Sequence, residues 1–186
     1  MYTREITDFD IDQIARSGQC FRLRPLTKDV YSLTAFGKYL EISQKGTEVA
    51  FSCTEQEFEA LWNGYFDLDT DYAGFKKAID PEDFYLQEAA RTGGGIRILR
   101  QELWETIVTF IISQQNNIPR IQKCVDALCR EFGETVLNFR GNTYDLFPEP
   151  EALAGTSEER LRELGLGYRA PYLVKTARMI CEGEAD

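Results

Sequence analysis

The hydrophobic period of the sequence changes once, near Thr54, and this change limits the fold more than any other feature. Before it, three runs rich in β-branched and aromatic residues are separated by hairpin-length turns: 30–36, 39–43 and 48–53. A further run, Cys20–Leu23, alternates in the manner of a strand. After it, apolar residues recur at helical spacing. Strands followed by helices predict an α+β fold in which an antiparallel sheet precedes a helical region.

The middle of the chain carries the signals of short capped helices. Helices are expected over three segments: 55–65, 72–79 and 81–92. Thr54 and Glu57 form a capping box at the start of the first helix, and the glycines 93–95 end the last one. Because these glycines also interrupt the apolar pattern, we place a domain boundary there, with domains over 1–95 and 96–186.

Four consecutive amide side chains, Gln114–Asn117, separate two further helix candidates. The first candidate, Leu103–Ile112, is apolar on all sides, which is typical of a helix buried in a core. The second, Pro119–Phe132, is amphipathic. Amides donate and accept hydrogen bonds as nucleobase edges do, so the cluster can take the place of a base. A polar turn that satisfies backbone groups and lets a proline begin the second helix explains the same residues without a ligand.

The rest of the second half is less regular. Residues 138–150 show no periodic pattern and are expected to be irregular. Thr156 and Glu159 form a capping box for a short helix over 158–164. A final helix follows and carries its apolar residues on one face: Leu173, Ala177 and Ile180.

Two turns each allow a structural and a functional interpretation. Tyr168 and Arg169 stand just before the final helix, where free N–H groups favour phosphate and where a ring beside a guanidinium suits a base. Alternatively, Tyr168 packs the turn and Arg169 lies in solvent. Gly18, in the turn Ser17-Gly18-Gln19, either supplies a positive φ or lets a ligand approach the backbone closely.

Several classes of site are excluded by composition. The chain has no histidine, which removes the commonest general base, the usual nucleophile triads and the commonest zinc ligand. Its five cysteines are scattered without a Cys-x-x-Cys pair, which indicates reduced thiols in a cytoplasm. The acidic stretch 67–71 resembles a calcium loop, but Tyr72 and Ala78 stand where the loop needs glycine and glutamate. We expect no metal and no cofactor.

The net charge of −10 argues against a nonspecific nucleic-acid binder, because phosphate contacts supply most of such affinity. Basic residues nevertheless gather in two clusters: Arg97, Arg100, Arg120, Lys123 and Arg130; then Arg160, Arg162, Arg169, Lys175 and Arg178. These clusters predict a local basic face on an otherwise acidic protein. The two clusters are equally well explained by solvent-exposed helix faces on which positive and negative side chains are interspersed. No apolar run is long enough to span a bilayer, and the first residues do not resemble a signal peptide.

Four ordered segments resemble the 8-oxoguanine DNA glycosylases of the helix-hairpin-helix superfamily. The segments are Ser17–Arg22, Gly95–Gln101, Phe110–Arg120 and Leu164–Ala170. They follow the family's order and together cover nearly the whole chain. The resemblance implies an N-terminal antiparallel β-sheet domain with flanking helices, TBP-like in kind, followed by part of an all-α helix-hairpin-helix glycosylase domain.

The resemblance also implies how DNA is read. These enzymes extrude the damaged guanine from the duplex into a pocket. The backbone carbonyl of Gly18 would accept a hydrogen bond from N7–H, a proton that 8-oxoguanine has and guanine lacks. A fixed backbone group suits the reading of so small a difference.

Other residues would hold the distorted duplex. Arg120 and Arg169 would bind the estranged cytosine, because guanidinium groups offer only donors and cytosine offers acceptors at O2 and N3. The gap in the stack would be filled or flanked by four side chains: Gln115, Asn116, Asn117 and Tyr168. Family members usually have Asn at the position of Gln115.

The family's catalytic groups have no counterpart in this sequence. The hairpin motif, the lysine nucleophile and the orienting aspartate follow the segment that matches Leu164–Ala170 by several tens of residues. Lys123 and Lys175 are the only lysines after residue 95, and neither matches the nucleophile. Because the lyase chemistry needs a lysine amine to attack the sugar C1′, we expect no catalytic residue within the chain and no activity from it alone.

The leading hypothesis is base-excision repair, in which a bifunctional N-glycosylase/AP lyase excises 8-oxoguanine opposite cytosine and this chain reads the lesion and the opposite base. An alkylated-purine DNA glycosylase is the first alternative, and a non-catalytic interaction domain is the second. The expected partner is double-stranded DNA with oxidised guanine, with no membrane, in the cytoplasm or on a bacterial nucleoid. Because the helical layer would lack neighbours, we expect it to expose apolar surface. We expect oligomers only through this surface.

Overall fold

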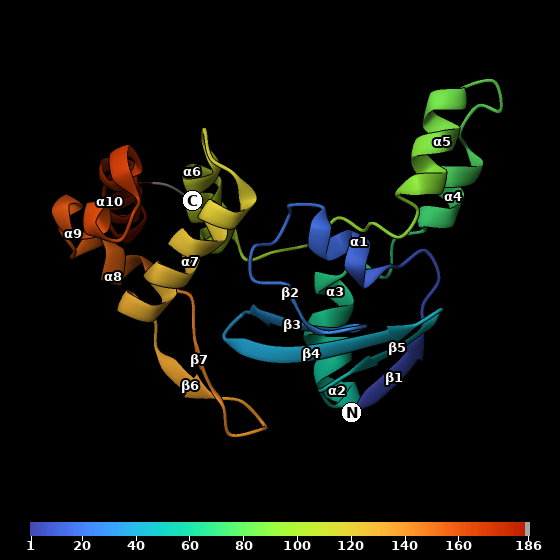
Figure 1. The fold of residues 1–186 in the computed structure, drawn as a ribbon, viewed down its shortest axis with the longest axis horizontal. Helices are drawn as coiled ribbons and strands as arrows, with labels where there is room; N and C mark the ends of the chain where they lie inside the picture. The colour runs from blue at the N-terminus through green and yellow to red at the C-terminus, as the bar shows by residue number, and fades with distance from the viewer. Residues whose placement is uncertain (185–186) are drawn as a thin grey trace. The chain divides into compact units, whose positions relative to one another are not determined.

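The computed structural model describes residues 1–184, which divide into two compact units (Figure 1). The first unit contains residues 1–33 and 40–101, and the second contains residues 34–39 and the described residues from 102 onward. The domain boundary predicted from the sequence after Gly95 stays a prediction.

A five-stranded sheet with the strand order β1-β5-β4-β3-β2 forms the base of the first unit. Its strands are β1 (Tyr2–Glu5), β2 (Arg24–Thr27), β3 (Val30–Ala35), β4 (Lys38–Lys45) and β5 (Glu48–Phe51). Phe51 pairs with Tyr2 on one side and with Ile42 on the other, both in antiparallel register. Leu33, Leu40, Ile42 and Phe51 are fully buried. The antiparallel sheet of the α+β class is thereby confirmed.

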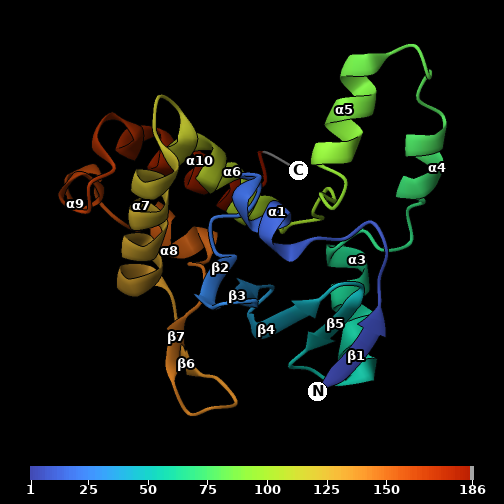
Figure 2. The same cartoon turned by 45° about the vertical axis from the view of Figure 1, so that its right-hand side comes forward.

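A continuous helix covers one face of this sheet (Figures 1 and 2). It consists of α2 (Glu55–Glu57), the π-helical segment η1 (Phe58–Trp62) and α3 (Asn63–Tyr65). The Thr54 hydroxyl accepts a hydrogen bond from the Glu57 N–H at 3.1 Å, as the capping box predicts. The ring centroids of Phe58 and Phe51 lie 4.7 Å apart, so the helix closes the core over β5.

Two elements near the N-terminus were not predicted, and one predicted strand is wrong. Strand β1 and helix α1 (Ile11–Arg16) are additional. The Asp10 carboxylate caps α1 by accepting from two backbone N–H groups of its first turn. The strand expected over Cys20–Leu23 is absent, and β2 begins only at Arg24. Cys20, Phe21 and Leu23 are all buried. Burial along this segment therefore does not alternate as it does along a strand with one exposed face.

Two short helices stand clear of the sheet in both views (Figures 1 and 2). They are α4 (Tyr72–Lys77) and α5 (Phe84–Thr92). Asp71 caps α4 by accepting from Gly74 N–H at 2.9 Å, and Gly93 ends α5. Neither helix contains a buried residue.

The second unit is mainly helical. Its elements are α6 (Leu103–Ser113), α7 (Ile118–Phe132), β6 (Thr135–Leu137), β7 (Thr143–Asp145), α8 (Pro150–Ala154), α9 (Glu158–Glu163), the 3₁₀ turn η2 (Gly167–Arg169) and α10 (Ala170–Cys181). Its core is made by apolar residues of several helices: Val108, Ile112, Val125, Leu128, Leu153, Leu161, Leu173 and Ala177. Leu173 and Ala177 are fully buried as expected, whereas Ile180 is half-buried.

Three local predictions fail in this unit. The segment 138–150, expected to be irregular, contains strand β7, which forms a hairpin with β6 in which Val136 pairs with Tyr144. Helix α9 is capped by Ser157, whose hydroxyl accepts from Arg160 N–H at 3.1 Å, and not by Thr156. Helix α6 is not buried on all sides, because Leu103 and Phe110 are exposed.

Candidate nucleic-acid interface

The amide cluster forms the connection between α6 and α7. The Asn116 Nδ2 group donates to the Ile112 carbonyl at 2.9 Å, and the Asn117 Oδ1 atom accepts from Arg120 N–H at 3.1 Å. Asn117 is therefore the N-cap of α7, and Pro119 lies in its first turn. The Gln114 Nε2 group likewise donates to the Phe110 carbonyl at 3.2 Å, so three of the four amides satisfy helix ends, as the structural interpretation predicts.

Gln115 has a different role in this connection. Its backbone has φ of +49°, in the left-handed region that residues other than Gly and Asn seldom adopt. Its side chain is exposed. The strained backbone therefore turns the chain and directs this side chain into solvent.

Arg169 fixes the end of α6. Its Nε atom donates to the Gln114 carbonyl at 3.1 Å, and its Nη2 atom donates to the same carbonyl and to that of Gln115 at 3.2 Å. The side chain is only 3% exposed. A guanidinium at the C-terminal end of a helix also meets the negative end of the helix dipole. The interpretation that places Arg169 in solvent is therefore wrong.

Tyr168 completes this arrangement. Its hydroxyl donates to the Gln114 carbonyl at 2.9 Å, and its ring centroid lies 4.5 Å from the guanidinium carbon of Arg169. The residue is nevertheless 53% exposed. One face of the ring is thus held against protein while the rest remains open to a ligand.

Arg120 lies in the first turn of α7 and is exposed. One turn further along α7, burial raises the pKa of the Cys124 thiol, while the charges of Arg120 and Arg169 act in the opposite direction. Both guanidinium groups therefore act on the same thiol. The structure brings together the predicted residues of the second unit: Gln115, Asn116, Asn117, Arg120, Tyr168 and Arg169.

The basic face is smaller than the sequence suggests. Arg160 forms ion pairs with Glu131 and Glu163, and Arg162 pairs with Glu158. Arg97 is buried in the first unit. Arg97 and the two paired arginines therefore contribute little free positive charge, and Arg120 becomes the most accessible arginine of the predicted site.

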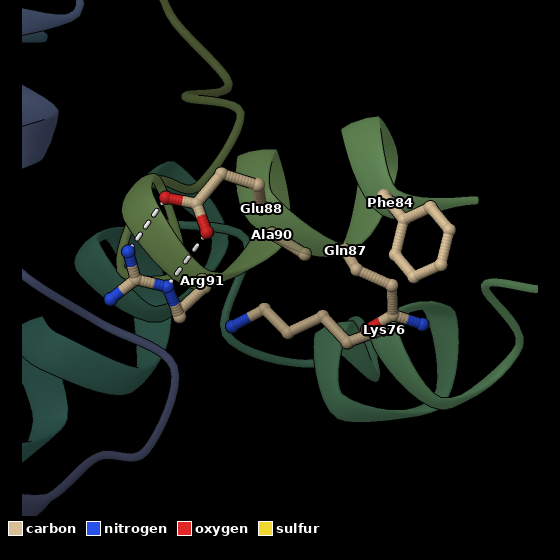
Figure 3. Close-up of a pocket in the computed structure, with 6 residues that line it drawn as sticks. All are labelled: Lys76, Phe84, Gln87, Glu88, Ala90 and Arg91. Carbon is tan, nitrogen blue, oxygen red and sulfur yellow. Dashed lines mark hydrogen bonds and ion pairs between the residues drawn. The ribbon is translucent and has the colours of Figure 1, made fainter. Parts of the chain in front are cut away.

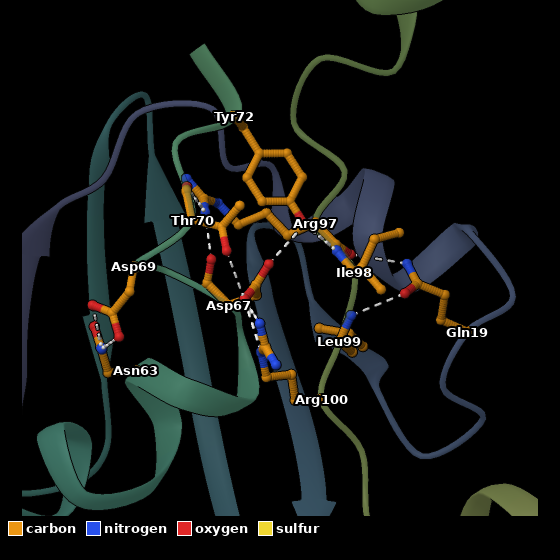
Figure 4. A network of polar contacts seen from close by, with 10 residues as sticks. All are labelled: Gln19, Asn63, Asp67, Asp69, Thr70, Tyr72, Arg97, Ile98, Leu99 and Arg100. Atoms are coloured by element: carbon orange, nitrogen blue, oxygen red, sulfur yellow. Dashed lines mark hydrogen bonds and ion pairs between the residues drawn. The ribbon is translucent and has the colours of Figure 1, made fainter. Parts of the chain in front are cut away.

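Gly18 lies in the first unit and has φ of +79°, so the turn does require a glycine. The neighbouring residue, Gln19, was given no role by the sequence. Its side chain accepts from Leu99 N–H at 3.0 Å and donates to the Arg97 carbonyl at 3.0 Å (Figure 4). Its own carbonyl accepts from Gln101 Nε2 at 2.7 Å. The Gly18 turn is therefore tied to the segment 96–101.

That segment is anchored by a buried polar network around Asp67 (Figure 4). The Asp67 carboxylate accepts from Arg100 Nε at 2.8 Å, Thr70 Oγ1 at 3.0 Å and Tyr72 hydroxyl at 3.1 Å. Burial by itself raises the pKa of Asp67, but these hydrogen bonds outweigh it and hold the pKa below its usual value. Burial, with help from the Asp67 charge, raises the pKa of Tyr72.

Arg97 occupies the centre of the same network. Its guanidinium donates to the backbone carbonyls of Thr7 at 3.2 Å, Asp8 at 3.0 Å and Asp67 at 2.7 Å. Its carbon lies 4.5 Å from the ring centroid of Tyr72. Nothing in the sequence distinguishes this buried arginine from its exposed neighbours.

Within residues 1–184, no helix is long and apolar enough to cross a membrane. In the same part of the chain, no group of three or more Cys, Asp and Glu side chains is arranged to hold a metal ion.

Comparison with known proteins gives matches along the whole described chain. The family model described as "8-oxoguanine DNA glycosylase, N-terminal domain" matches residues 1–107, and "HhH-GPD superfamily base excision DNA repair protein" matches residues 108–184. The "N-glycosylase/DNA lyase" of Saccharomyces cerevisiae is 46% identical over 93 residues, which is 50% of this chain and 25% of that protein. The "N-glycosylase/DNA lyase OGG1" of Arabidopsis thaliana is 28% identical over 170 residues, 88% of this chain and 46% of that protein.

A solved structure shows the same relation. The Clostridium acetobutylicum 8-oxoguanine glycosylase/lyase, in complex with double-stranded DNA containing cytosine opposite 8-oxoguanine, is 35% identical with a TM-score of 0.92. The match covers 98% of this chain and 63% of that one. This chain thus spans less than two thirds of each of these relatives. It belongs to the 8-oxoguanine DNA glycosylase family of base-excision repair proteins.

Proposed function

We propose that this chain supplies the lesion-reading and opposite-base-reading surfaces of a bifunctional DNA glycosylase/AP lyase that excises 8-oxoguanine opposite cytosine. The observation that carries the proposal is the convergence of Tyr168, Arg169 and the Gln114–Asn117 connection at the end of α6. This arrangement combines the exposed ring of Tyr168, the exposed amide of Gln115 and the exposed guanidinium of Arg120 with the buried guanidinium of Arg169.

The arrangement suits a duplex from which one base has been removed. The Gln115 side chain projects from a sharply turned backbone and can enter the vacated position in the stack. The exposed ring of Tyr168 can stack on a neighbouring base. Asn116 and Asn117 support this surface chiefly by holding the ends of α6 and α7.

The two arginines suit cytosine better than adenine. Arg120 is exposed, so its whole guanidinium can donate to acceptors such as O2 and N3 of cytosine. Arg169 already uses Nε and Nη2 on the Gln114 and Gln115 carbonyls, which leaves Nη1 as its donor toward a base. Adenine would set its own amino group against these donors, so it should bind less well.

The Gly18 carbonyl is the proposed reader of the lesion. Gln19 and the segment 96–101 hold the turn in place, so the carbonyl can be a fixed acceptor. Such an acceptor binds the N7–H donor of 8-oxoguanine and leaves the bare N7 of guanine without a partner. The catalytic lysine and aspartate would lie in the remaining part of the family's fold, so this chain alone should not cleave DNA.

The proposal is tested by binding and by covalent trapping. The chain should bind a duplex with 8-oxoguanine opposite cytosine more tightly than the same duplex with adenine opposite, measured by fluorescence anisotropy at fixed salt. Arg120→Ala should remove most of this preference. Arg130→Ala, an exposed arginine in the last turn of the same helix, is the matched control and should change affinity equally for both duplexes.

Borohydride trapping on the same duplex tests catalysis. No adduct is expected with this chain alone. An adduct is expected when the chain is fused to the part of a relative that lies beyond the match. An adduct with the chain alone would place the nucleophile within these residues and refute that part of the proposal.

Excision of 3-methyladenine but not 8-oxoguanine by the continued chain would favour the alkylated-purine alternative. Loss of stability alone in an Arg120→Ala, Arg169→Ala double variant would favour a non-catalytic interaction domain.

A further inference from the structure

The carbonyl proposed as the reader of the lesion belongs to the peptide group between Gly18 and Gln19. A peptide group is planar and rotates as a unit, with the carbonyl on one side and the N–H of the next residue on the other. Glycine adopts positive and negative φ about equally well, so a peptide group beside it can rotate at low cost. A half-turn of this peptide would replace the Gly18 carbonyl by the Gln19 N–H group.

Such a half-turn would reverse the preference of the turn for one base over the other. A carbonyl oxygen accepts a hydrogen bond from the N7–H group of 8-oxoguanine, whereas an N–H group donates to the bare N7 of guanine. Discrimination therefore requires that one orientation of the peptide group is held. Gly18 does not supply this restraint itself, because its backbone tolerates both orientations.

The side chain of Gln19 is bound at three points, two of which are shown in Figure 4. Its Nε2 atom donates to the Arg97 carbonyl at 3.0 Å and to Ser17 Oγ at 3.0 Å. Its Oε1 atom accepts from Leu99 N–H at 3.0 Å. The side-chain amide thus bonds to residues 97 and 99 as a peptide group of a neighbouring strand would. Both of its N–H donors and one of its acceptor sites are satisfied.

The backbone is held on both sides of the same peptide group. The Gln19 carbonyl accepts from Gln101 Nε2 at 2.7 Å. Before the glycine, the Ser17 hydroxyl donates to the Ile14 carbonyl at 2.7 Å, and the Ser17 N–H donates to the same carbonyl at 3.2 Å. These bonds fix the turn to the end of α1 and to the segment 97–101.

The bonds of Gln19 oppose a half-turn of the peptide. The φ of Gln19 lies outside the left-handed region. A half-turn with the rest of the chain fixed would bring this φ to positive values, which glutamine seldom adopts. The chain can avoid this strain only if the side chain and the carbonyl of Gln19 move, and the hydrogen bonds to both of them prevent such a movement.

We propose that Gln19 and Gln101 are positioning residues that hold the Gly18–Gln19 peptide in the orientation that reads 8-oxoguanine, and that the peptide admits guanine when they are removed. The inference rests on the proposed function, because it concerns the carbonyl that is assigned there to the lesion. Both glutamines act on the base only through this carbonyl. The selectivity of the turn is thus set by side chains that lie behind it.

The lesion ratio tests this assignment. We define it as the Kd for a duplex with guanine opposite cytosine divided by the Kd for the same duplex with 8-oxoguanine opposite cytosine, measured by fluorescence anisotropy at fixed salt. Gln19→Ala and Gln101→Met should each lower the ratio about fivefold, which corresponds to the loss of one hydrogen bond. Tighter binding of guanine should account for part of the fall, because the rotated peptide donates to its N7.

Two further variants serve as controls. Gln87 on α5 lies at an open hollow of the same unit, and its Nε2 atom also donates to backbone carbonyls, those of Ile79 at 3.3 Å and Asp80 at 3.4 Å (Figure 3). Gln87→Ala should therefore leave the lesion ratio unchanged. Gln101→Lys keeps an N–H donor within reach of the Gln19 carbonyl, so it should retain a lesion ratio close to that of the original chain.

A second ratio separates positioning from a general loss of structure. The preference for cytosine over adenine opposite 8-oxoguanine should stay the same in all four variants, because the residues proposed to read the opposite base belong to the second unit. Hydrogen exchange without DNA checks the local effect. The Leu99 amide should exchange faster in Gln19→Ala, which removes its acceptor, and should not change in Gln87→Ala.

Two results would overturn the positioning role. One is a lesion ratio that survives both Gln19→Ala and Gln101→Met while Leu99 exchanges faster. The other is a fall of the lesion ratio and of the cytosine preference together, which would mean that the glutamines only stabilise the fold. The original chain shows which proposal has failed. If it has no lesion ratio, the reading by Gly18 is refuted and the inference falls with it. If it has one that the variants keep, only the positioning role is refuted.

Discussion

Two buried arginines, one in each unit, make closely similar contacts. The guanidinium carbon of Arg97 lies 4.5 Å from the ring centroid of Tyr72, and that of Arg169 lies 4.5 Å from the ring centroid of Tyr168. Each arginine also donates to the carbonyl of a residue with left-handed backbone. In both places the guanidinium stabilises a sharp turn that the backbone would otherwise avoid.

The difference lies in what surrounds the rings. Arg97 is enclosed, with Nε, Nη1 and Nη2 all donating to carbonyls, and the Tyr72 hydroxyl is bound to Asp67 and to Ile98 N–H. Arg169 uses Nε and Nη2, while Tyr168 is half exposed. The same pair of residue types can therefore hold a fold or, as we propose for Tyr168 and Arg169, present a reading surface. The accessible tyrosine distinguishes the second use from the first.

Replacing Arg97 should have the largest effect. Arg97→Ala removes a buried guanidinium that donates to three carbonyls, of which that of Asp67 is buried and those of Thr7 and Asp8 are partly buried, so we expect the free energy of unfolding to fall by about 3 kcal/mol. Urea unfolding followed by tryptophan fluorescence measures this change. Arg91→Ala is the control, since Arg91 is exposed and its ion pair with Glu88 lies in solvent. Equal free energies of unfolding of the two variants would show that Arg97 does not stabilise the fold.

As the pH falls, the contacts around Arg97 should lose stability at a higher pH than those around Arg169, because the Asp67 carboxylate lies among the former. A carboxylate whose pKa is lowered on folding stabilises the protein above its ordinary pKa, and this contribution is lost as the pH falls through the folded value. Asp67→Asn should cost about 2 kcal/mol at pH 7. The difference between the variant and the original chain should begin to shrink below about pH 4, the ordinary carboxyl pKa, and should vanish only below the lower folded pKa, where the original carboxyl is neutral as well. Parallel unfolding free energies from pH 7 to pH 3 would contradict this assignment.

Replacing Arg169 should change recognition more than stability. Arg169→Lys keeps the charge but loses the planar fork that serves two carbonyls and, in the proposed complex, one base. The preference for cytosine opposite the lesion should fall about tenfold, which corresponds to about 1.4 kcal/mol. Anisotropy with cytosine and adenine duplexes gives the ratio. A loss of stability as large as that of Arg97→Ala, with the ratio unchanged, would make Arg169 a purely structural residue.

Replacing Gln115, one of the residues with left-handed backbone, should have the smallest effect. Asp67 has φ of +52° and Gln115 has φ of +49°. Asp and Asn adopt this conformation more readily than Gln does. Gln115→Asn should therefore stabilise the chain by about 0.5 kcal/mol, seen as a small rise in Tm, while shortening the side chain in the proposed gap. A fall in Tm would show that the Gln115 side chain makes contacts that compensate its backbone strain.

The sequence predicted elements whose apolar pattern is local. Strands β3, β4 and β5 and the helix that begins at Thr54 lie close to their expected bounds, because alternation and helical spacing report directly on burial. Helices α6 and α7 were found for the same reason. Strand β1 was missed because it has four residues and its pairing partner, β5, lies more than forty residues away.

The candidate site was predictable only in part. Its residues in the second unit were named through the family resemblance, and the structure brings them together. Burial of Arg97 and Arg169 was not foreseen, since an arginine in a sequence carries no sign of the carbonyls it will meet. Gln19 was overlooked because its partners, Leu99 and Gln101, are about eighty residues away.

The hydrogen bonds to the Gln114 carbonyl also have a consequence for the order of folding. They join a helix end to side chains 54 and 55 residues later in the chain. Such distant contacts form late, because a long loop must close before they stabilise anything. During synthesis, α6 and the amide connection leave the ribosome well before Arg169 does. We therefore expect the nascent chain to acquire its sheet first and its reading surface only when the turn before α10 emerges.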